Sequence, residues 1–193
     1  MQNLINIDQN IFYWFNSFIG KNPTFDFVIK ILAVYLIYLI PLVFIFFWFY
    51  YRNEKTQKFL LELCFFSVVG WQIIARIIGM IVNRPRPDTF LGTKEVIFHP
   101  PTYSFPSDHA TFLAIITTYL YLSGYKKMAN IVLIITILIP LSRIIAGLHW
   151  PGDVLAGWLL GIALAFLFYS ARKYIQKYLV NPIYSIAKKI RLA

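Results

Sequence analysis

The sequence predicts an all-α fold, a polytopic bundle of membrane helices. The 193 residues are 59% hydrophobic and only 13% charged, and their mean hydropathy is +0.65. These values are typical of proteins that live in a bilayer and unlike those of soluble domains. The chain also contains a series of apolar runs close to the roughly 20 residues that a helix needs to cross the hydrocarbon core. We therefore expect about five transmembrane helices in a single domain of residues 1–193.

The elements are expected in the following order. Residues 1–20 mix large apolar side chains with Asn, Gln and Asp, which predicts an amphipathic helix lying in the membrane interface. This start has neither a basic leader nor a continuous apolar stretch, so no cleavable signal peptide is expected. Five spans follow, at residues 27–50, 59–82, 108–125, 128–148 and 153–171. The third and fifth are short, which is typical of helices that begin below the surface in a cavity made by their neighbours.

The distribution of Lys and Arg predicts which end of the bundle faces the cytoplasm. With five alternating spans, eleven basic residues fall on one side, in connections 51–58 and 126–127 and in the tail after residue 171. Six fall on the opposite side. The positive-inside rule assigns the richer side to the cytoplasm. We therefore expect a multi-pass protein of the cell membrane, with a cytoplasmic C-terminus and with loop 83–105 outside.

The remaining composition excludes several classes of protein. Lys and Arg outnumber Asp and Glu by 18 to 8, but no basic stripe with exposed aromatics occurs, so no nucleic-acid partner is expected. Cys64 is the single cysteine and cannot form an internal disulfide. No metal-ligand spacing is recognisable, so neither a metal nor another cofactor is expected. Glu62 is expected to snorkel or to pair with Lys58, and His99 to lie on the surface of the outer loop.

Three polar blocks stand at the edges of the apolar runs. They are Arg84-Pro85-Arg86-Pro87, Pro106-Ser107-Asp108-His109, and Ser142-Arg143 followed by His149 and Asp153. Transfer of a phosphoryl group through a covalent histidine needs a nucleophile, an acid for the leaving group and fixed positive charge around the oxygens. Two histidines, several arginines, a serine and a carboxylate supply these groups. The blocks therefore predict a phosphate-handling site at the outer face of the cell membrane.

The spacing within the last block suggests a role for each residue. A neutral imidazole at His149 can attack phosphorus, and Asp153 can hold the other ring nitrogen and stabilise the developing positive charge. Alternatively, Asp153 only caps the last helix as its N-cap residue and His149 is an interfacial side chain. Ser107, at a helix start, offers a hydroxyl beside backbone N–H groups and is expected to bind the phosphate. The planar guanidinium groups of Arg86 and Arg143 can grip phosphoryl oxygens bidentately.

In the order and spacing of these blocks, the sequence resembles the type 2 phosphatidic acid phosphatase superfamily of membrane lipid phosphatases, over residues 59–171. The resemblance implies that His149 is the nucleophile, that His109 protonates the leaving group, and that Asp153 holds the nucleophile. It also implies that Arg86 and Arg143 clamp the phosphate.

Two positions depart from the pattern of that family. Members usually carry Lys seven residues before Arg86, where this sequence has Gly79, and Gly where it has Asp108. Arg76, one helical turn before Gly79, is expected to supply the missing charge and to contribute at least about tenfold to kcat/KM. Adding Gly79→Lys is expected to recover part of its loss. Asp108 is expected to turn toward Arg84 or Arg76, and Arg84 could instead contact a lipid headgroup.

The second block also bears on the substrate. Ser-Phe-Pro-Ser-Asp-His-Ala-Thr, at residues 104–111, resembles the bacitracin-resistance type of undecaprenyl diphosphatase within the superfamily. The resemblance implies hydrolysis of a polyprenyl diphosphate to the monophosphate through a phosphohistidine, at an outward-facing site. A phosphatase of phosphatidic acid or phosphatidylglycerophosphate, or a lipid phosphotransferase, would use the same residues and remains an alternative.

Overall fold

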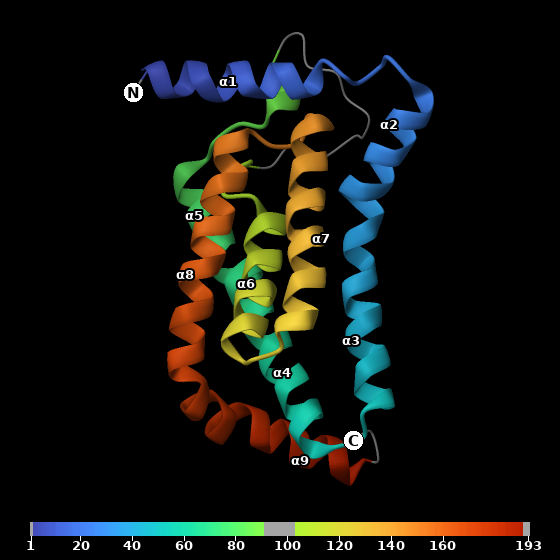
Figure 1. The fold of residues 1–193 in the computed structure, drawn as a ribbon. Helices are drawn as coiled ribbons and strands as arrows, with labels where there is room; N and C mark the ends of the chain where they lie inside the picture. The colour runs from blue at the N-terminus through green and yellow to red at the C-terminus, as the bar shows by residue number, and fades with distance from the viewer. Residues whose placement is uncertain (1, 91–102, 191–193) are drawn as a thin grey trace.

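The computed structural model describes residues 2–90 and 103–190, so Lys94 and His99 of the outer loop lie outside the described residues. The described residues form helices joined by turns, without a strand (Figure 1). The α-helices are α1 (Gln2–Asn16), α2 (Pro23–Lys30), α3 (Leu39–Tyr50), α4 (Glu54–Val68), α5 (Arg76–Val82), α6 (Asp108–Leu122), α7 (Lys126–Ile145), α8 (Pro151–Ile175) and α9 (Asn181–Lys189). Tighter or wider helical turns continue several of them, at Ile31–Tyr35, Leu36–Tyr38, Val69–Ala75, Pro87–Thr89 and Gln176–Val180.

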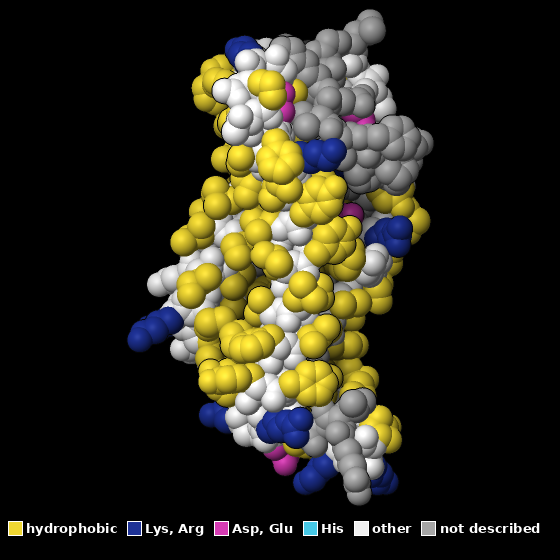
Figure 2. Space-filling view, turned by 90° about the vertical axis from the view of Figure 1, so that its right-hand side faces the viewer, with side chains coloured by type: hydrophobic (Ala, Val, Ile, Leu, Met, Phe, Trp, Pro, Cys, Tyr) yellow, Lys and Arg dark blue, Asp and Glu magenta, His cyan; other side chains and the backbone are white. Residues whose placement is uncertain are grey.

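Helices α2 to α8 run along the long axis of the molecule, with α6 in the middle, and α1 and α9 lie across opposite ends (Figure 1). The N-terminus and the C-terminus therefore lie at opposite ends of the molecule (Figure 1). Figure 2 shows hydrophobic side chains covering most of one lateral face, with Lys and Arg side chains mainly toward the two ends. The sequence prediction of an all-helical membrane bundle is confirmed.

The lengths of the spans differ from the prediction in two places. Within the described residues, four helical stretches are long and apolar enough to cross a membrane: Pro23–Tyr50, Glu54–Thr89, Lys126–Ile145 and Pro151–Lys189. The expected third span, 108–125, is α6, whose 15 residues are too short to cross alone. The expected fifth span, 153–171, is instead part of a 39-residue helical stretch that bends into α9.

Helix α6 forms the centre of the core because it is apolar on all sides. It packs mainly against α8 and α7. Gly157 and Gly161 allow the backbone of α8 to approach it closely: an added Cβ would lie 2.7 Å from the Ser107 carbonyl oxygen and 2.5 Å from the Thr111 carbonyl oxygen, respectively. Small residues four positions apart are a common device for close helix packing in membranes.

Helix α1 closes one end of the bundle, where it contacts α7 and α8. Phe12 is fully buried, with its ring centroid 4.9 Å from that of Trp150. The Asn16 side-chain amide donates a hydrogen bond to the Ile145 carbonyl, at 3.0 Å. Ile7 and Trp14 are exposed. One face of α1 therefore covers the bundle while large apolar side chains elsewhere on it remain available to the interface, as the sequence predicted for residues 1–20.

The expectation for Glu62 was wrong. Lys58 pairs with Glu54, at 2.6 Å, because these two residues lie one helical turn apart on the exposed face of α4. Glu62 is buried, and its carboxylate accepts hydrogen bonds from the Tyr119 hydroxyl and, at 2.6 Å, from the Gln176 amide. It thus links α4 and α6 to the turn that leads into α9.

Candidate active site

The predicted site residues lie at the ends of different helices, which come together beneath α1. Arg86 follows α5 in an extended segment, Ser107 is the N-cap of α6, and Arg143 lies in the last turn of α7. His149 and Asp153 belong to the connection between α7 and α8 and to the first turn of α8. All five residues are buried.

The surroundings of His149 define the state of its ring. Its Nδ1 lies 2.9 Å from the carbonyl oxygen of Ser104. Because a carbonyl oxygen only accepts hydrogen bonds, Nδ1 carries the proton and, in the neutral ring, Nε2 keeps the lone pair. Nη1 of Arg86 lies 3.3 Å from Nε2. The nitrogen that can attack an electrophile therefore faces a guanidinium group that can hold the electrophile's anionic oxygens.

Asp153 lies beside His149 but is bound mainly by other groups. Its carboxylate accepts hydrogen bonds from Arg84 Nη1, at 2.7 Å, and from the backbone N–H of Trp150, at 2.9 Å. The distance from Oδ2 to His149 Nδ1 is 3.8 Å. The hydrogen-bond partner of Nδ1 is thus the Ser104 carbonyl, whereas Asp153 was expected to hold this nitrogen. The carboxylate still lies close enough to stabilise a charged imidazole.

The expected N-cap role of Asp153 is also corrected. Trp150 has the extended backbone of an N-cap residue, and Pro151 begins α8. Asp153 is the third residue of the helix and reaches back to the Trp150 N–H, a reciprocal form of capping that Glu or Asp at this position often supplies. The fixed φ of Pro151 suits the first helical position, which explains why the helix begins two residues earlier than expected.

The two buried arginines are oriented by backbone carbonyls. Arg86 Nη1 donates to the Leu148 carbonyl at 2.7 Å, and Arg143 Nη1 donates to the Ala33 carbonyl at 2.8 Å. Ala33 lies in the wide helical turn Ile31–Tyr35, where the backbone departs from α-helical hydrogen bonding. Within the described part of the chain, Arg143 Nε has no hydrogen-bond partner. A backbone carbonyl thus helps to orient each guanidinium.

Ser107 and His109 stand at the start of α6. The Ser107 N–H donates to the Asp153 carbonyl at 3.0 Å, which ties the beginnings of α6 and α8 together. The Ser107 hydroxyl oxygen is buried and has no hydrogen-bond partner among the described residues. A buried hydroxyl without a partner is unfavourable, and a bound anion would satisfy it. His109 lies one helical position beyond Asp108 and lines a cavity.

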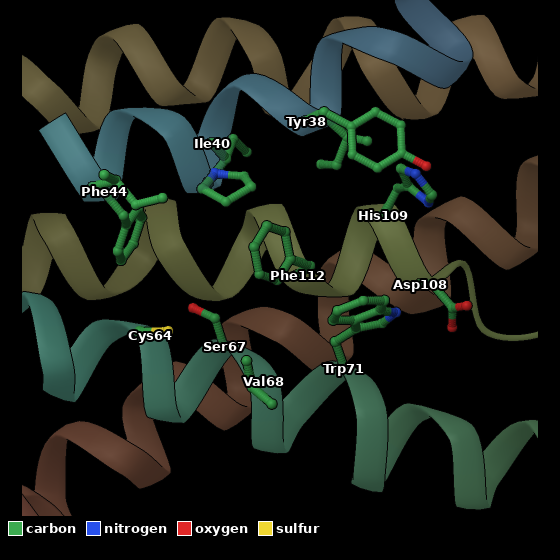
Figure 3. A pocket seen from close by; sticks show the side chains of 13 residues that line it. Tyr38, Ile40, Phe44, Cys64, Ser67, Val68, Trp71, Asp108, His109 and Phe112 are labelled. Atoms are coloured by element: carbon green, nitrogen blue, oxygen red, sulfur yellow. The ribbon is translucent and has the colours of Figure 1, made fainter.

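That cavity has a volume of about 490 Å³ and lies between the α2–α3 stretch, α4 with the turn that follows it, and α6 (Figure 3). Asp108, His109 and Tyr38 lie at one end, and Phe44 and Cys64 lie toward the other (Figure 3). Its lining is otherwise almost entirely apolar, and several lining side chains, such as Tyr38 and Ile45, are exposed on the lateral surface of the bundle. The cavity can therefore be reached from the side of the membrane.

Asp108 and Arg84 have other partners than the sequence suggested. The Trp71 indole points toward the Asp108 carboxylate in Figure 3, and Arg86 and Arg143 lie within electrostatic range of that carboxylate. Arg84 is not a partner of Asp108, because the two terminal nitrogens of Arg84 bind Asp8 and Asp153. The sequence also left open that Arg84 contacts a lipid headgroup. In the structure it binds two carboxylates of the protein instead.

Arg76 is exposed, and its Nη1 donates to Gln72 at 3.3 Å. The expected rescue by Gly79→Lys meets a steric obstacle: a Cβ at Gly79 would lie 2.6 Å from the Tyr103 ring and 2.9 Å from the Phe105 carbonyl oxygen. The space that a lysine at this position would need is occupied by the segment leading to α6.

The described residues include no group of three or more His, Cys, Asp or Glu side chains placed to hold a metal ion. The sequence reasoning missed three contributors to the site: the Ser104 carbonyl, Trp71 and Asp8. A backbone carbonyl has no sequence signature, and Trp71 lies within an apolar run. Asp8 had a weak signal, because it is the single acidic residue in the amphipathic segment 1–20.

Membrane-spanning helices whose ends bring together a buried histidine, two buried arginines and a buried serine hydroxyl that has no hydrogen-bond partner among the described residues define an integral membrane protein with a site suited to phosphate. The chain belongs to the PAP2 superfamily, whose sequence profile matches residues 59–177.

Individual relatives agree with this assignment. The chain is 32% identical to the undecaprenyl-diphosphatase of Sulfolobus acidocaldarius over 115 residues, 59% of this chain and 55% of that protein. It is also 32% identical to phosphatidylglycerophosphatase B of Bacillus subtilis over 123 residues, 58% of this chain and 57% of that protein. The matches thus span little more than half the length of these relatives. A crystal structure of a PAP2-type phosphatidylglycerolphosphate phosphatase from Bacillus subtilis has the same fold, with a TM-score of 0.71 at 23% identity over 92% of this chain and 90% of that one.

Proposed function

We propose that this protein is a lipid phosphatase that hydrolyses undecaprenyl diphosphate, or a similar polyprenyl diphosphate, to the monophosphate and inorganic phosphate. The observation that carries the proposal is the apolar cavity whose one end is formed by His109 and Asp108. A lipid chain can lie along the apolar lining while the headgroup stays at the polar end. This arrangement suits a substrate that is apolar along most of its length and doubly charged at its tip.

The reaction would begin with His149. Its Nε2 lone pair attacks the terminal phosphorus, a nitrogen–phosphorus bond forms, and the bond from phosphorus to the bridging oxygen breaks. His109 gives a proton to that oxygen, which leaves as the lipid monophosphate. Water then attacks the phosphohistidine with His109 as the base, and inorganic phosphate is released. The Nδ1 hydrogen bond to the Ser104 carbonyl supports the nucleophilic role because it leaves the lone pair on Nε2.

Charge in the transition state would be stabilised by two sets of groups. Arg86, Arg143 and the Ser107 hydroxyl bind the equatorial oxygens of the phosphoryl group. Asp153, 3.8 Å from Nδ1, stabilises the positive charge that develops on the imidazole. The proximity of Arg86 Nη1 to Nε2 supports this assignment, because it puts positive charge beside the bond that forms.

A second candidate substrate is supported by the similarity to the Bacillus subtilis phosphatases that act on phosphatidylglycerophosphate. That lipid, or phosphatidic acid, would present a phosphomonoester to the same residues. The polyprenyl diphosphate is preferred because the Sulfolobus relative bears that name and because residues 104–111 have the corresponding motif. Transfer to another lipid instead of water is the third alternative.

The test is the release of inorganic phosphate by the purified full chain in detergent. Undecaprenyl diphosphate, phosphatidic acid and phosphatidylglycerophosphate are compared side by side, with His149→Ala as the inactive variant and His99→Ala as a matched histidine control outside the motif blocks. We expect the highest kcat/KM for the polyprenyl diphosphate and no turnover by His149→Ala. Phosphate release by His149→Ala at the parent rate would refute the mechanism. Phosphate release from phosphatidic acid or phosphatidylglycerophosphate but not from undecaprenyl diphosphate would refute the proposed substrate.

We also propose that the site faces the outside of the cell membrane, so that the carrier lipid is recycled after it has delivered its cargo. The Lys and Arg residues of connections 51–58 and 126–127 and of the tail after residue 171 support a cytoplasmic location for the α9 end. The site lies at the opposite end, beneath α1 (Figure 1).

A further inference from the structure

Helix α1 lies outside the segment that matches the PAP2 superfamily, yet one of its side chains enters the site. The two carboxylate oxygens of Asp8 have different partners. One accepts a hydrogen bond from the backbone N–H of Gly152, at 2.7 Å, and the other binds Arg84 Nη2. Asp8 thus contacts both the first turn of α8, which carries Asp153, and the arginine that binds Asp153.

Arg84 stands between two carboxylates. Its Nη1 binds Asp153 at 2.7 Å and its Nη2 binds Asp8, while its guanidinium carbon lies 5.3 Å from the centre of the Trp150 ring. These three contacts come from different elements and fix the plane of the guanidinium. When both carboxylates are ionised, the group of three carries one net negative charge. Without Asp8 it would be neutral.

The place of Asp8 is itself fixed by packing. Phe12, one turn further along α1, is fully buried against Trp150, and Asn16 binds the end of α7. The side chain of Asp8 is 14% exposed. Because α1 is held at these points, Asp8 does not have to be ordered separately when substrate binds.

We propose that Asp8 is a positioning residue for the proposed reaction. It orients Arg84 and balances its charge, so that the negative charge of Asp153 remains effective toward His149. A lone Arg84 would cancel that charge at the moment when the imidazole becomes positive. Asp8 therefore acts on the chemical step and not on substrate binding, and this inference rests on the proposed function.

The variant Asp8→Asn tests the charge with little change in shape. The amide oxygen can still accept from the Gly152 N–H, whereas the negative charge toward Arg84 is lost. We expect kcat to fall about tenfold, because charged groups in one network typically interact by an energy of this size. KM should change by less than about twofold. Asp8→Glu should recover part of kcat. Asp26→Asn is the matched control. The Asp26 carboxylate accepts from the Gly20 N–H of the nearby turn, so this substitution should leave kcat unchanged.

A double-mutant cycle shows whether Asp8 acts through Arg84. In an Arg84→Gln background, Asp8→Asn should change kcat by less than about twofold, because there is no longer a positive charge to balance. A full tenfold loss in that background, or an Asp8→Asn variant as active as the parent, would overturn the proposal. A rise in KM with unchanged kcat would also overturn it.

Vanadate binding provides a readout that needs no turnover. Vanadate can occupy a phosphate site as a five-coordinate mimic with a bond to the histidine, so Asp8→Asn should weaken its affinity by about the same factor as kcat. If the parent binds vanadate but releases phosphate from none of the lipids, the proposed substrate fails while this comparison still tests Asp8. Equal vanadate affinities of the parent and Asp8→Asn would refute the positioning role.

Discussion

Replacement of Asp153 by Asn is the sharpest test of the charge arrangement around His149. The carboxylate oxygen lies 3.8 Å from Nδ1 in a fully buried position. At that separation and an effective dielectric constant of about 20, a full charge on the imidazole is stabilised by about 4 kcal/mol. If half of the charge has developed in the transition state, Asp153→Asn removes about 2 kcal/mol of transition-state stabilisation. We therefore expect kcat to fall by between about 30-fold and 1000-fold.

The assay is phosphate release from undecaprenyl diphosphate in detergent, with kcat and KM measured separately. The Asn side chain can still accept from the Trp150 N–H, so the start of α8 should be preserved, and a thermal melt followed by circular dichroism checks this. Glu54→Gln serves as a control for the loss of a carboxylate, because Glu54 binds Lys58 at the opposite end of the bundle. An Asp153→Asn variant with kcat within about threefold of the parent would refute the electrostatic argument.

Further predictions concern the acid, the absence of a metal, the sidedness and position 79. His109→Ala should lower kcat less for substrates with good leaving groups, and an equal loss across a leaving-group series would contradict its role as the acid. Activity should survive EDTA because buried arginines supply the positive charge; loss in EDTA that Mg²⁺ restores would contradict this. In a Cys64→Ala background, Lys21→Cys should react with an impermeant maleimide in spheroplasts and Lys188→Cys only after permeabilisation; the reverse would place the site inside. Gly79→Lys should lower the melting temperature instead of rescuing Arg76→Gln, because even its Cβ meets the Tyr103 ring.

The location of the candidate site could be predicted from the sequence because the chain has few polar residues to place. In a bilayer, polar side chains between apolar runs must lie at helix ends, and alternation of the passes decides which end. Two of the site residues, Arg86 and Ser107, lie between α5 and α6, and two more, Arg143 and His149, lie at the end of α7 and just after it. These positions are all at one end of the bundle. The amphipathic segment 1–20 was predicted for the same reason, since it is too polar to cross.

The detailed contacts could not be predicted, because they depend on the backbone and on distant segments. The carbonyl groups of Ser104, Leu148 and Ala33, which orient the ring and the two arginines, are present in every residue and have no pattern. Periodicity also does not distinguish an apolar run that faces lipid from one enclosed by protein, so the sequence predicted a short span at 108–125 but not that α6 is the central helix of the bundle. Position 79 could not be judged without knowing that Tyr103 packs against it.

The close packing of α6 and α8 connects the fold to the chemistry. In a bilayer, apolar side chains gain little from leaving lipid, so helix association depends on close contact between backbones. Gly157 provides such contact at the Ser107 carbonyl, and the same approach lets the Ser107 N–H bind the Asp153 carbonyl. The helix that begins with Asp108 and His109 is therefore joined to the helix that carries Asp153 at the point where both enter the site. Their relative position, which must hold during attack and protonation, therefore depends on the close approach that Gly157 allows.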